Sequence, residues 1–367
     1  MAKTLYINTG INGMGVLGRR LLRMMFELNY DENYPADFHI FQINDPNMTA
    51  EQLAYLLQYD TVYGIWGRTV EAISGDIVID GKTIIFTHIN YDDTKGWYNC
   101  NWGGNSVEYV FDCMGIDSLE TNAAMSTHFD GGAKNVFCCG NAMTNEMVSV
   151  VFGITHKGVD VSSTPIVGIY TGDIQAAAVI GTLLDDNCRV EYAIYENICS
   201  YTNLNNLEDS ALNGYDNNPQ IGRAGAWNII PVKPLYARCV GLVAPQVNGK
   251  IKGRELRAGT IVGAFMNITA DVHDFDATTF YAYVKATVAG DLASAYKNNA
   301  MCVKYVDGYF NVSSDAIGEP CIIMNANDYV KLTANMVNIQ VLYDAISLQA
   351  GNAILVATYW NEQQRGV

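Results

Sequence analysis

Residues 5–18 read LYINTGINGMGVLG, an apolar run followed by a turn rich in glycine. The apolar residues favour a strand over 4–9. Residues 17–29 then place leucine and methionine at helical spacing on one face, which predicts an amphipathic helix. A second apolar segment, 38–43, predicts another strand. The order strand, glycine turn, helix, strand predicts a βαβ unit in this part of the chain.

The glycines of this turn have the spacing G-x-G-x-x-G, which is typical of dinucleotide-binding turns. Because Gly13, Gly15 and Gly18 lack side chains, the backbone can approach a pyrophosphate at the amino terminus of the helix. Asp45 follows the second strand, where an acid accepts hydrogen bonds from ribose hydroxyls. Together with Asn12, these residues form the predicted cofactor site. A glycine turn that only packs a strand closely against a helix is the alternative.

The remaining pattern predicts an α/β chain of two domains. Up to residue 171, helices alternate with apolar strands of the buried, parallel kind. Beyond residue 190 the strands are longer and alternate apolar with polar residues, which indicates half-buried antiparallel strands. We expect a Rossmann-type domain over 1–171, joined by a C-terminal helix over 350–367, and a second domain over 172–349. The expected elements are strands over 107–112, 135–139, 166–170, 190–201 and 260–271, a hairpin within 67–90, a strand pair over 320–337 that turns at 325–328, and helices over 49–57, 119–129, 173–184, 278–289 and 350–359.

Composition narrows the classes of partner. The chain has 367 residues, of which 49% are hydrophobic and only 16% are charged, and its net charge is −16. The negative charge opposes binding to nucleic acid or to an anionic membrane. A surface with few charges favours contacts with other proteins. A composition bias of the lineage is the alternative explanation for the low fraction of charged residues.

Targeting and metal-binding patterns are missing from the sequence. No apolar run has the length of a membrane span and no signal-peptide pattern is present, so we expect a cytoplasmic protein. The nine cysteines form no C-x-x-C pair and the five histidines do not cluster with them. This spacing predicts neither a metal site nor a disulfide framework.

Several motifs occur in one order along the chain: Ile11-Asn12-Gly13-Met14-Gly15, Ile43-Asn44-Asp45-Pro46, Tyr59-Asp60-Thr61-Val62-Tyr63-Gly64, Asn228-Ile229-Ile230-Pro231 and Asn248-Gly249-Lys250. The first three are similar to I-N-G-F-G, I-N-D-P and Y-D-S-V-H-G. With these motifs, the chain resembles the phosphorylating glyceraldehyde-3-phosphate dehydrogenase family over essentially its whole length. The resemblance implies a Rossmann domain that binds NAD, an α+β catalytic domain and a tetramer.

The catalytic residues of that family do not carry over. The family places S-C-T-T-N where a strand leads into a helix, and its cysteine is the nucleophile. Here residues 171–175 read TGDIQ, so Gly172 stands at the position of that cysteine. The family's histidine base precedes S-Y-T-N, and here Cys199 precedes Ser200-Tyr201-Thr202-Asn203. Since neither the nucleophile nor the base is present, we predict no catalytic residues and a degenerate member of the family.

The groups that bind substrate and cofactor in the family are preserved in part. By the resemblance, Thr202, Arg223 and Arg257 are remnants of the anion sites, although Arg257 serves equally well as a structural ion-pair partner. Asn338 falls near the place of the family's nicotinamide asparagine. Val16, however, replaces an arginine beside the glycine turn. Because each lost polar contact weakens binding by about 1 kcal/mol, the lost contacts predict reduced affinity for NAD.

Three functions remain open. The first is a non-catalytic structural or scaffolding protein that joins protein partners in a larger assembly, for which a cytoskeletal or ciliary microtubule lattice is one setting, with a homo-oligomer (dimer or tetramer) as a further expected state. The second is a sensor or regulatory subunit that binds NAD(H). The third is a divergent NAD-dependent oxidoreductase, which requires a polar pocket around Thr202, Arg257 and Asn338.

Overall fold

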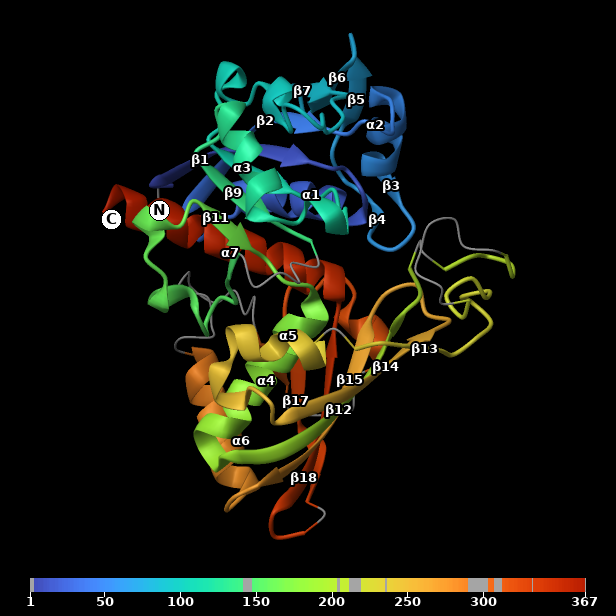
Figure 1. Cartoon of the computed structure of the whole chain (residues 1–367), viewed down its shortest axis with the longest axis vertical. Helices are drawn as coiled ribbons and strands as arrows, with labels where there is room; N and C mark the ends of the chain where they lie inside the picture. Colours follow the sequence, from blue (N-terminus) through green and yellow to red (C-terminus); the bar gives the residue numbers. More distant parts are fainter. Residues whose placement is uncertain are drawn as a thin grey trace. The chain divides into compact units, whose positions relative to one another are not determined.

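The computed structural model describes residues 3–140, 147–202, 205–210, 219–234, 236–289, 303–306, 312–331 and 333–366. The chain divides into two compact units. The first contains the described residues up to Thr171 and those from Gln349 onward, and the second contains the described residues from Gly172 to Leu348. Each unit has a large sheet of its own, flanked by helices (Figure 1). This architecture confirms the predicted α/β class.

The sheet of the first unit has nine strands in the order β10-β11-β9-β8-β1-β2-β7-β6-β5. The strands from β10 to β7 pair in parallel, and β7, β6 and β5 continue as antiparallel neighbours. Since β1 pairs with both β2 and β8, the carboxyl end of β1 is the switch point at which such sheets bind ligands. The strands are β1 (Leu5–Asn12), β2 (Ala36–Asn44), β5 (Val70–Ile73), β6 (Asp76–Ile79), β7 (Lys82–Thr87), β8 (Tyr109–Asp112), β9 (Asn135–Cys138), β10 (Val148–Ser149) and β11 (Ile166–Gly168), with a separate pair of β3 (Tyr59–Asp60) and β4 (Gly64–Ile65).

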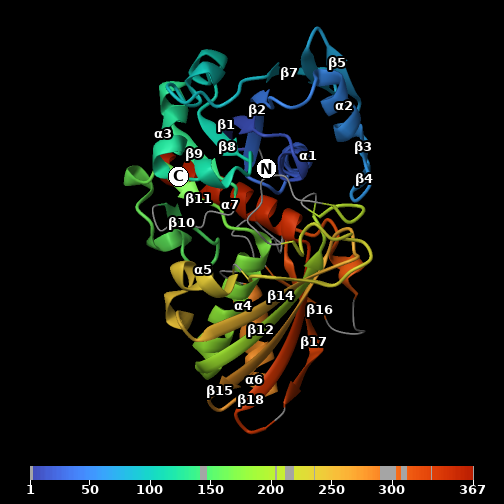
Figure 2. The same ribbon diagram turned by 45° about the vertical axis from the view of Figure 1, so that its right-hand side comes forward.

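Local sequence signals define the helices of this unit. Helix α2 begins at the predicted capping box, in which the Thr49 hydroxyl accepts from the Gln52 backbone N–H and the Gln52 side chain accepts from that of Thr49. Helices α1 and α3 lie on opposite sides of the parallel strands (Figure 2). The helices are α1 (Val16–Tyr30), α2 (Ala50–Gln58), α3 (Asn122–Asp130) and α7 (Ala345–Arg365), the first residues of which belong to the second unit.

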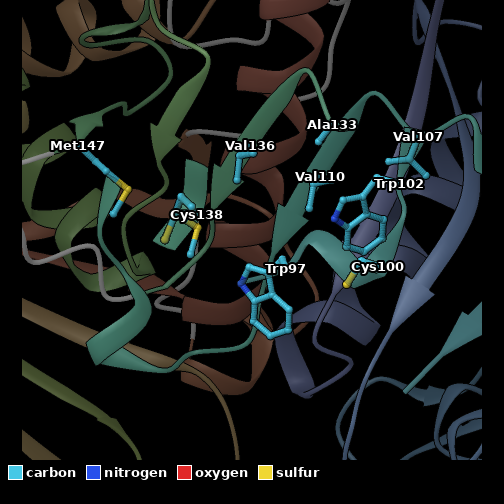
Figure 3. Close-up of a cluster of buried hydrophobic side chains, with 10 residues drawn as sticks. Trp97, Cys100, Trp102, Val107, Val110, Ala133, Val136, Cys138 and Met147 are labelled. Atoms are coloured by element: carbon cyan, nitrogen blue, oxygen red, sulfur yellow. The ribbon is translucent and has the colours of Figure 1, made fainter. Parts of the chain in front are cut away.

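Both faces of β8 and β9 are buried, which explains their continuous apolar sequences. Val110 and Val136 point into a cluster with Met125 of α3, and two buried tryptophans and Cys138 complete that cluster (Figure 3). Phe111 and Phe137 point to the opposite face and stack with a centroid distance of 5.0 Å. The ring of Trp360 from α7 packs edge-on against Phe137.

The second unit contains a seven-stranded sheet in the order β13-β14-β12-β15-β18-β17-β16. The pairs β12–β14 and β16–β17 are parallel, and the other pairs are antiparallel. Helices cover one face of this sheet (Figure 1). On the other face Tyr192, Ile194 and Ile198 of β12 remain exposed. The elements are β12 (Val190–Ser200), β13 (Ile230–Val232), β14 (Ile251–Ala258), β15 (Ala264–Val272), β16 (Val303–Val306), β17 (Ile322–Lys331), β18 (Met336–Tyr343), α4 (Gly172–Cys188), α5 (Tyr236–Val243) and α6 (Ala277–Ala289).

Two predicted elements need correction. The turn expected at 325–328 does not form, because these residues belong to β17. The register of the pairing between β17 and β18 shifts between Met324 and Tyr329. The final helix was expected to begin at residue 350, whereas α7 begins at Ala345. Ala345, the first residue of α7, lies close to Gly172.

Candidate functional site

The glycine turn of the first unit has the close packing that its sequence predicts. Gly13 has a φ of 94°, a backbone conformation that favours glycine, and its N–H donates to the Asn44 carbonyl at 2.7 Å. A Cβ on Gly18 would lie 2.0 Å from the Gly13 carbonyl oxygen. A Cβ on Gly15 would meet nothing within 4 Å, so the backbone here is open to a ligand. The turn therefore combines the tight packing and the free approach that a pyrophosphate site requires.

Asp45 is held directly beside this turn. Its Oδ2 accepts from the Met14 N–H at 2.8 Å, and its Oδ1 accepts from the Asn47 N–H at 2.8 Å. The residue is 5% exposed. Each carboxylate oxygen has a second lone pair, so Asp45 can also accept from a ribose hydroxyl. The predicted role of Asp45 is compatible with its position.

Asn12 lies behind the turn and is fully buried. Its Oδ1 accepts from Asn44 at 2.8 Å and its Nδ2 donates to Asp112 at 2.7 Å. Asp112 also accepts from His128 Nε2 at 3.0 Å, and His128 Nδ1 accepts from the Trp102 indole at 2.9 Å. The side chain of Asn12 is therefore engaged in this buried network, and its predicted part in the cofactor site stays a prediction.

The first unit thus retains the backbone elements of a dinucleotide site. An open glycine turn and an acid at the end of β2 fit the pyrophosphate and one ribose of NAD. Val16, beside the turn, is 42% exposed and has no charge to offer the phosphates. The residues present fit the cofactor, and the reduced affinity for NAD stays a prediction.

In the second unit, helix α4 begins at Gly172 and has Asp173 in its first turn. A Cβ built on Gly172 would lie 2.5 Å from the Ala345 carbonyl oxygen and 2.6 Å from the Ala345 Cα. Real Cβ atoms do not approach backbone this closely, because the repulsion rises steeply. The backbone of Ala345 therefore fills the space in which a cysteine side chain would begin.

Cys199, near the end of β12, has a carboxylate neighbour. Its Sγ lies 3.5 Å from Glu255 Oε1 of β14, and residues 199 and 255 belong to strands that pair in parallel. Arg257 Nη2 contacts the same Glu255 oxygen at 2.9 Å, and Arg257 Nη1 donates to the Ser200 carbonyl at 3.2 Å. Arg257, predicted as a remnant of an anion site, therefore forms an ion pair within the protein, which is the alternative role given for it above.

Burial governs the protonation of this cluster. Burial raises the pKa of the Cys199 thiol well above its ordinary range, and the Glu255 carboxylate adds to the rise. Burial and the nearby Asp173 carboxylate raise the pKa of Glu255 to about 7, while Arg257 acts in the opposite direction. Cys199 is consequently a neutral thiol near pH 7 and is a poor substitute for an imidazole base.

Two further predicted remnants of the anion sites are Arg223 and Thr202. Arg223 forms an exposed ion pair with Asp209 at 2.7 Å. The Thr202 N–H donates to the Asn205 side chain at 3.1 Å. Asn203, part of the S-Y-T-N motif, lies outside the described residues.

Asn338 lies within β18, where its side chain donates to the Asn267 side-chain oxygen at 2.9 Å and to the Thr269 hydroxyl at 3.0 Å. Tyr343, five residues along the same strand, points to the face on which its hydroxyl donates to Asn197. Because strand residues alternate between faces, Asn338 lies on the face opposite to Tyr343, and thus opposite to the face that carries Arg257. The described part of the second unit does not bring Asn338 and Arg257 together.

Glu255 was not among the site residues predicted from the sequence. The residue lies two positions before Arg257, and the resemblance gives no reason to single it out. The alternation of Ile251, Gly253 and Glu255 along one strand was the available signal, since it points an acid toward the buried face.

The described ranges contain no cluster of three or more His, Cys, Asp or Glu side chains able to hold a metal ion. Among the helices placed by the structure, none combines the length and the apolar sequence that a bilayer span needs.

Comparison with known proteins covers both units. The family model for the glyceraldehyde 3-phosphate dehydrogenase NAD binding domain matches residues 7–118, and the model for the C-terminal domain matches residues 175–345. The glyceraldehyde-3-phosphate dehydrogenase of Kitasatospora aureofaciens is 28% identical over 335 residues, which cover 91% of this chain and 93% of the relative. That of Neurospora crassa is 27% identical over 344 residues, which cover 92% of each chain.

Proposed function

Because this chain belongs to the glyceraldehyde-3-phosphate dehydrogenase family, we propose that it is a non-catalytic member that serves as a structural or scaffolding subunit. The observation that carries the proposal is the close approach of the Ala345 backbone to Gly172. Gly172 stands where the family's nucleophile would be, and a side chain there would overlap the Ala345 carbonyl oxygen. The site therefore lacks both the thiol and the space for it.

The surroundings of Arg257 support the same proposal. An anion site needs a positive group that is free to pair with the ligand. Here the guanidinium group of Arg257 already pairs with Glu255. Asp173 adds a second negative charge at the amino terminus of α4, where a bound anion would otherwise be favoured. An anionic substrate would have to compete with an internal carboxylate.

Restoring the missing groups tests this reading. We expect the double variant Gly172→Cys, Cys199→His to show no turnover of glyceraldehyde 3-phosphate with NAD and phosphate, because the Ala345 backbone excludes the new side chain. The single variant Cys199→His is the control for disturbance of β12, and circular dichroism monitors folding of both. Turnover by the double variant would show that the position is open.

The exposed face of the second sheet supports a role in assembly. Ile194 and Ile198 are 41% and 39% exposed on one face of β12. Exposed apolar residues grouped on a sheet favour contact with protein. We propose that this face joins the chain to a second copy or to another protein of a larger assembly, such as a cytoskeletal lattice.

Native mass spectrometry and identification of co-purifying chains test the assembly. Ile194→Asp with Ile198→Asp should release the bound chains or dissociate an oligomer, whereas Ile73→Asp, at an isoleucine of the first unit that is 50% exposed, should not. A wild-type chain that purifies as a monomer without partners would contradict the scaffolding role.

A sensor that binds NAD(H) is the second candidate, and the geometry of Asp45 beside the open Gly15 turn favours it. Calorimetric titration with NAD and NADH should give a weak saturable signal, and Asp45→Ala should weaken it by about tenfold, as expected for the loss of a hydrogen bond to a charged group. No heat at millimolar ligand would end this candidate. The divergent oxidoreductase receives no such support, since Asn338 and Arg257 lie on opposite faces of the sheet.

A further inference from the structure

Two cysteines lie side by side where two parallel strands of the first unit end. Asp112 and Cys138 are register partners in β8 and β9. The pairing continues one step further, because the Cys139 N–H donates to the Asp112 carbonyl at 2.8 Å. Cys113 and Cys139 are therefore the next residues opposite each other across the strand pair.

Both thiols point to the same face. Phe111 and Phe137, two residues earlier in each strand, stack against each other at 5.0 Å. Since side chains two residues apart share a face, Cys113 and Cys139 continue this ladder. Cys138 points to the opposite face, into the cluster of buried apolar residues drawn in Figure 3.

The spacing of such a pair suits a covalent bond. Neighbouring strands lie about 4.8 Å apart, and disulfides join Cα atoms separated by roughly 4.4–6.8 Å. All eight cysteines that the structure describes are free thiols, so the pair is in the reduced state. The Cys113 thiol also interacts directly with that of Cys139.

We propose that Cys113 and Cys139 form a redox modification site that hydrogen peroxide converts into an intramolecular disulfide. The Cys113 sulfur attacks one peroxide oxygen, the O–O bond breaks, and water leaves with a sulfenic acid on Cys113. The Cys139 sulfur then attacks the Cys113 sulfur, the S–S bond forms, the S–O bond breaks and a second water leaves. The two thiols lose two hydrogens and two electrons, and the peroxide is reduced to two waters.

Exposure sets the order of these steps. Cys113 is 8% exposed and Cys139 is 3% exposed, so an oxidant reaches Cys113 first. Burial raises the pKa of Cys139 well above its ordinary range, and the neighbouring Cys113 thiol adds to the rise, which makes Cys139 the resolving partner.

The site lies next to the glycine turn. The Cys113 N–H donates to the Asn12 carbonyl at 2.6 Å, and a Cβ on Gly13 would lie 2.7 Å from the Cys113 carbonyl carbon. The disulfide would thus fix the loop after β8 to the end of β9 beside the switch point of the sheet. This inference does not depend on the proposed loss of catalysis or on the scaffolding role.

Peroxide treatment followed by peptide mapping under non-reducing conditions tests the proposal. We expect the intact chain to become lighter by two hydrogen atoms, with the peptides of Cys113 and Cys139 linked until a reductant is added. Cys113→Ser and Cys139→Ser should each abolish the linked peptide, whereas Cys138→Ser, on the adjacent but opposite-facing residue, should retain it. The wild-type map needs no variant, so a variant that fails to fold leaves the test intact.

Two results would overturn the proposal. The first is a linked peptide in which Cys138 or another cysteine replaces either partner. The second is a chain whose Cys113 becomes sulfinic or sulfonic acid while Cys139 remains a free thiol, because a resolving thiol in contact would capture the sulfenic acid first.

Discussion

The buried acid in the second unit predicts a specific dependence of stability on pH. Glu255 is 4% exposed and contacts both Arg257 and Cys199. Burial and Asp173 raise its pKa from 4.5 to about 7. A carboxyl group with a raised pKa favours the folded state while it is protonated. The stability it provides is therefore present below pH 4.5 and is lost as the pH rises toward 7.

The size of the loss follows from the two pKa values. With 4.5 in the unfolded chain and about 7 in the folded chain, linkage gives a loss of roughly 2–3 kcal/mol in the free energy of unfolding between about pH 5 and pH 8. Glu255→Gln removes the titration and keeps the shape of the side chain. The ion pair with Arg257 forms only while the carboxyl group is ionised, so its contribution is already contained in the folded pKa of Glu255. The pH-dependent difference between the two chains therefore reports the titration of Glu255 with its partners in place.

Urea unfolding of the wild type and of Glu255→Gln at both pH values measures this difference, and hydrogen exchange on peptides from β14 identifies the transition of the second unit. We expect the variant to gain roughly 2–3 kcal/mol relative to wild type on going from the lower to the higher pH. Glu71→Gln, at an exposed edge-strand position, controls for the loss of one charge. A difference that does not change with pH would refute the reasoning.

Three further changes test the packing. Gly172→Ala should destabilise the second unit by about 1–3 kcal/mol, because its Cβ would overlap the Ala345 backbone, and a thermal midpoint equal to that of wild type would contradict the overlap. Asp112→Ala should cost about 3 kcal/mol in urea unfolding, because it leaves buried donors of Asn12 and His128 without an acceptor, and a cost below 1 kcal/mol would show that water replaces it. Thr49→Ala should cost about 1 kcal/mol through the lost cap, and unchanged protection of the first turn of α2 in hydrogen exchange would argue against the capping box.

Features set by local chemistry could be predicted from the sequence. The capping box of Thr49 and Gln52 and the glycine turn form as expected, because each depends on residues a few positions apart. The turn expected at 325–328 was wrong, since the pairing of β17 with β18 satisfies the backbone and overrides the turn preference of asparagine and aspartate. Neighbours in sequence cannot reveal such pairing.

At the candidate site too, some features could be predicted from the sequence and others depend on tertiary contacts. The positions of Gly172 and Cys199 follow from motif order alone. Glu255 reaches Cys199 only because β12 and β14 pair in parallel across 56 residues of sequence, and Ala345 approaches Gly172 across a longer separation still. These contacts decide whether a side chain or an anion fits, and they depend on tertiary structure.

The most direct test of the central claim is a turnover measurement on the purified wild-type chain. Glyceraldehyde 3-phosphate, phosphate and NAD or NADP are supplied at millimolar concentration, and formation of NADH or NADPH is followed beside a relative from the family as positive control. We expect a rate equal to that of the blank, for the wild type and for Cys199→Ser alike. Measurable turnover by the wild type, above all turnover that Cys199→Ser abolishes, would contradict it.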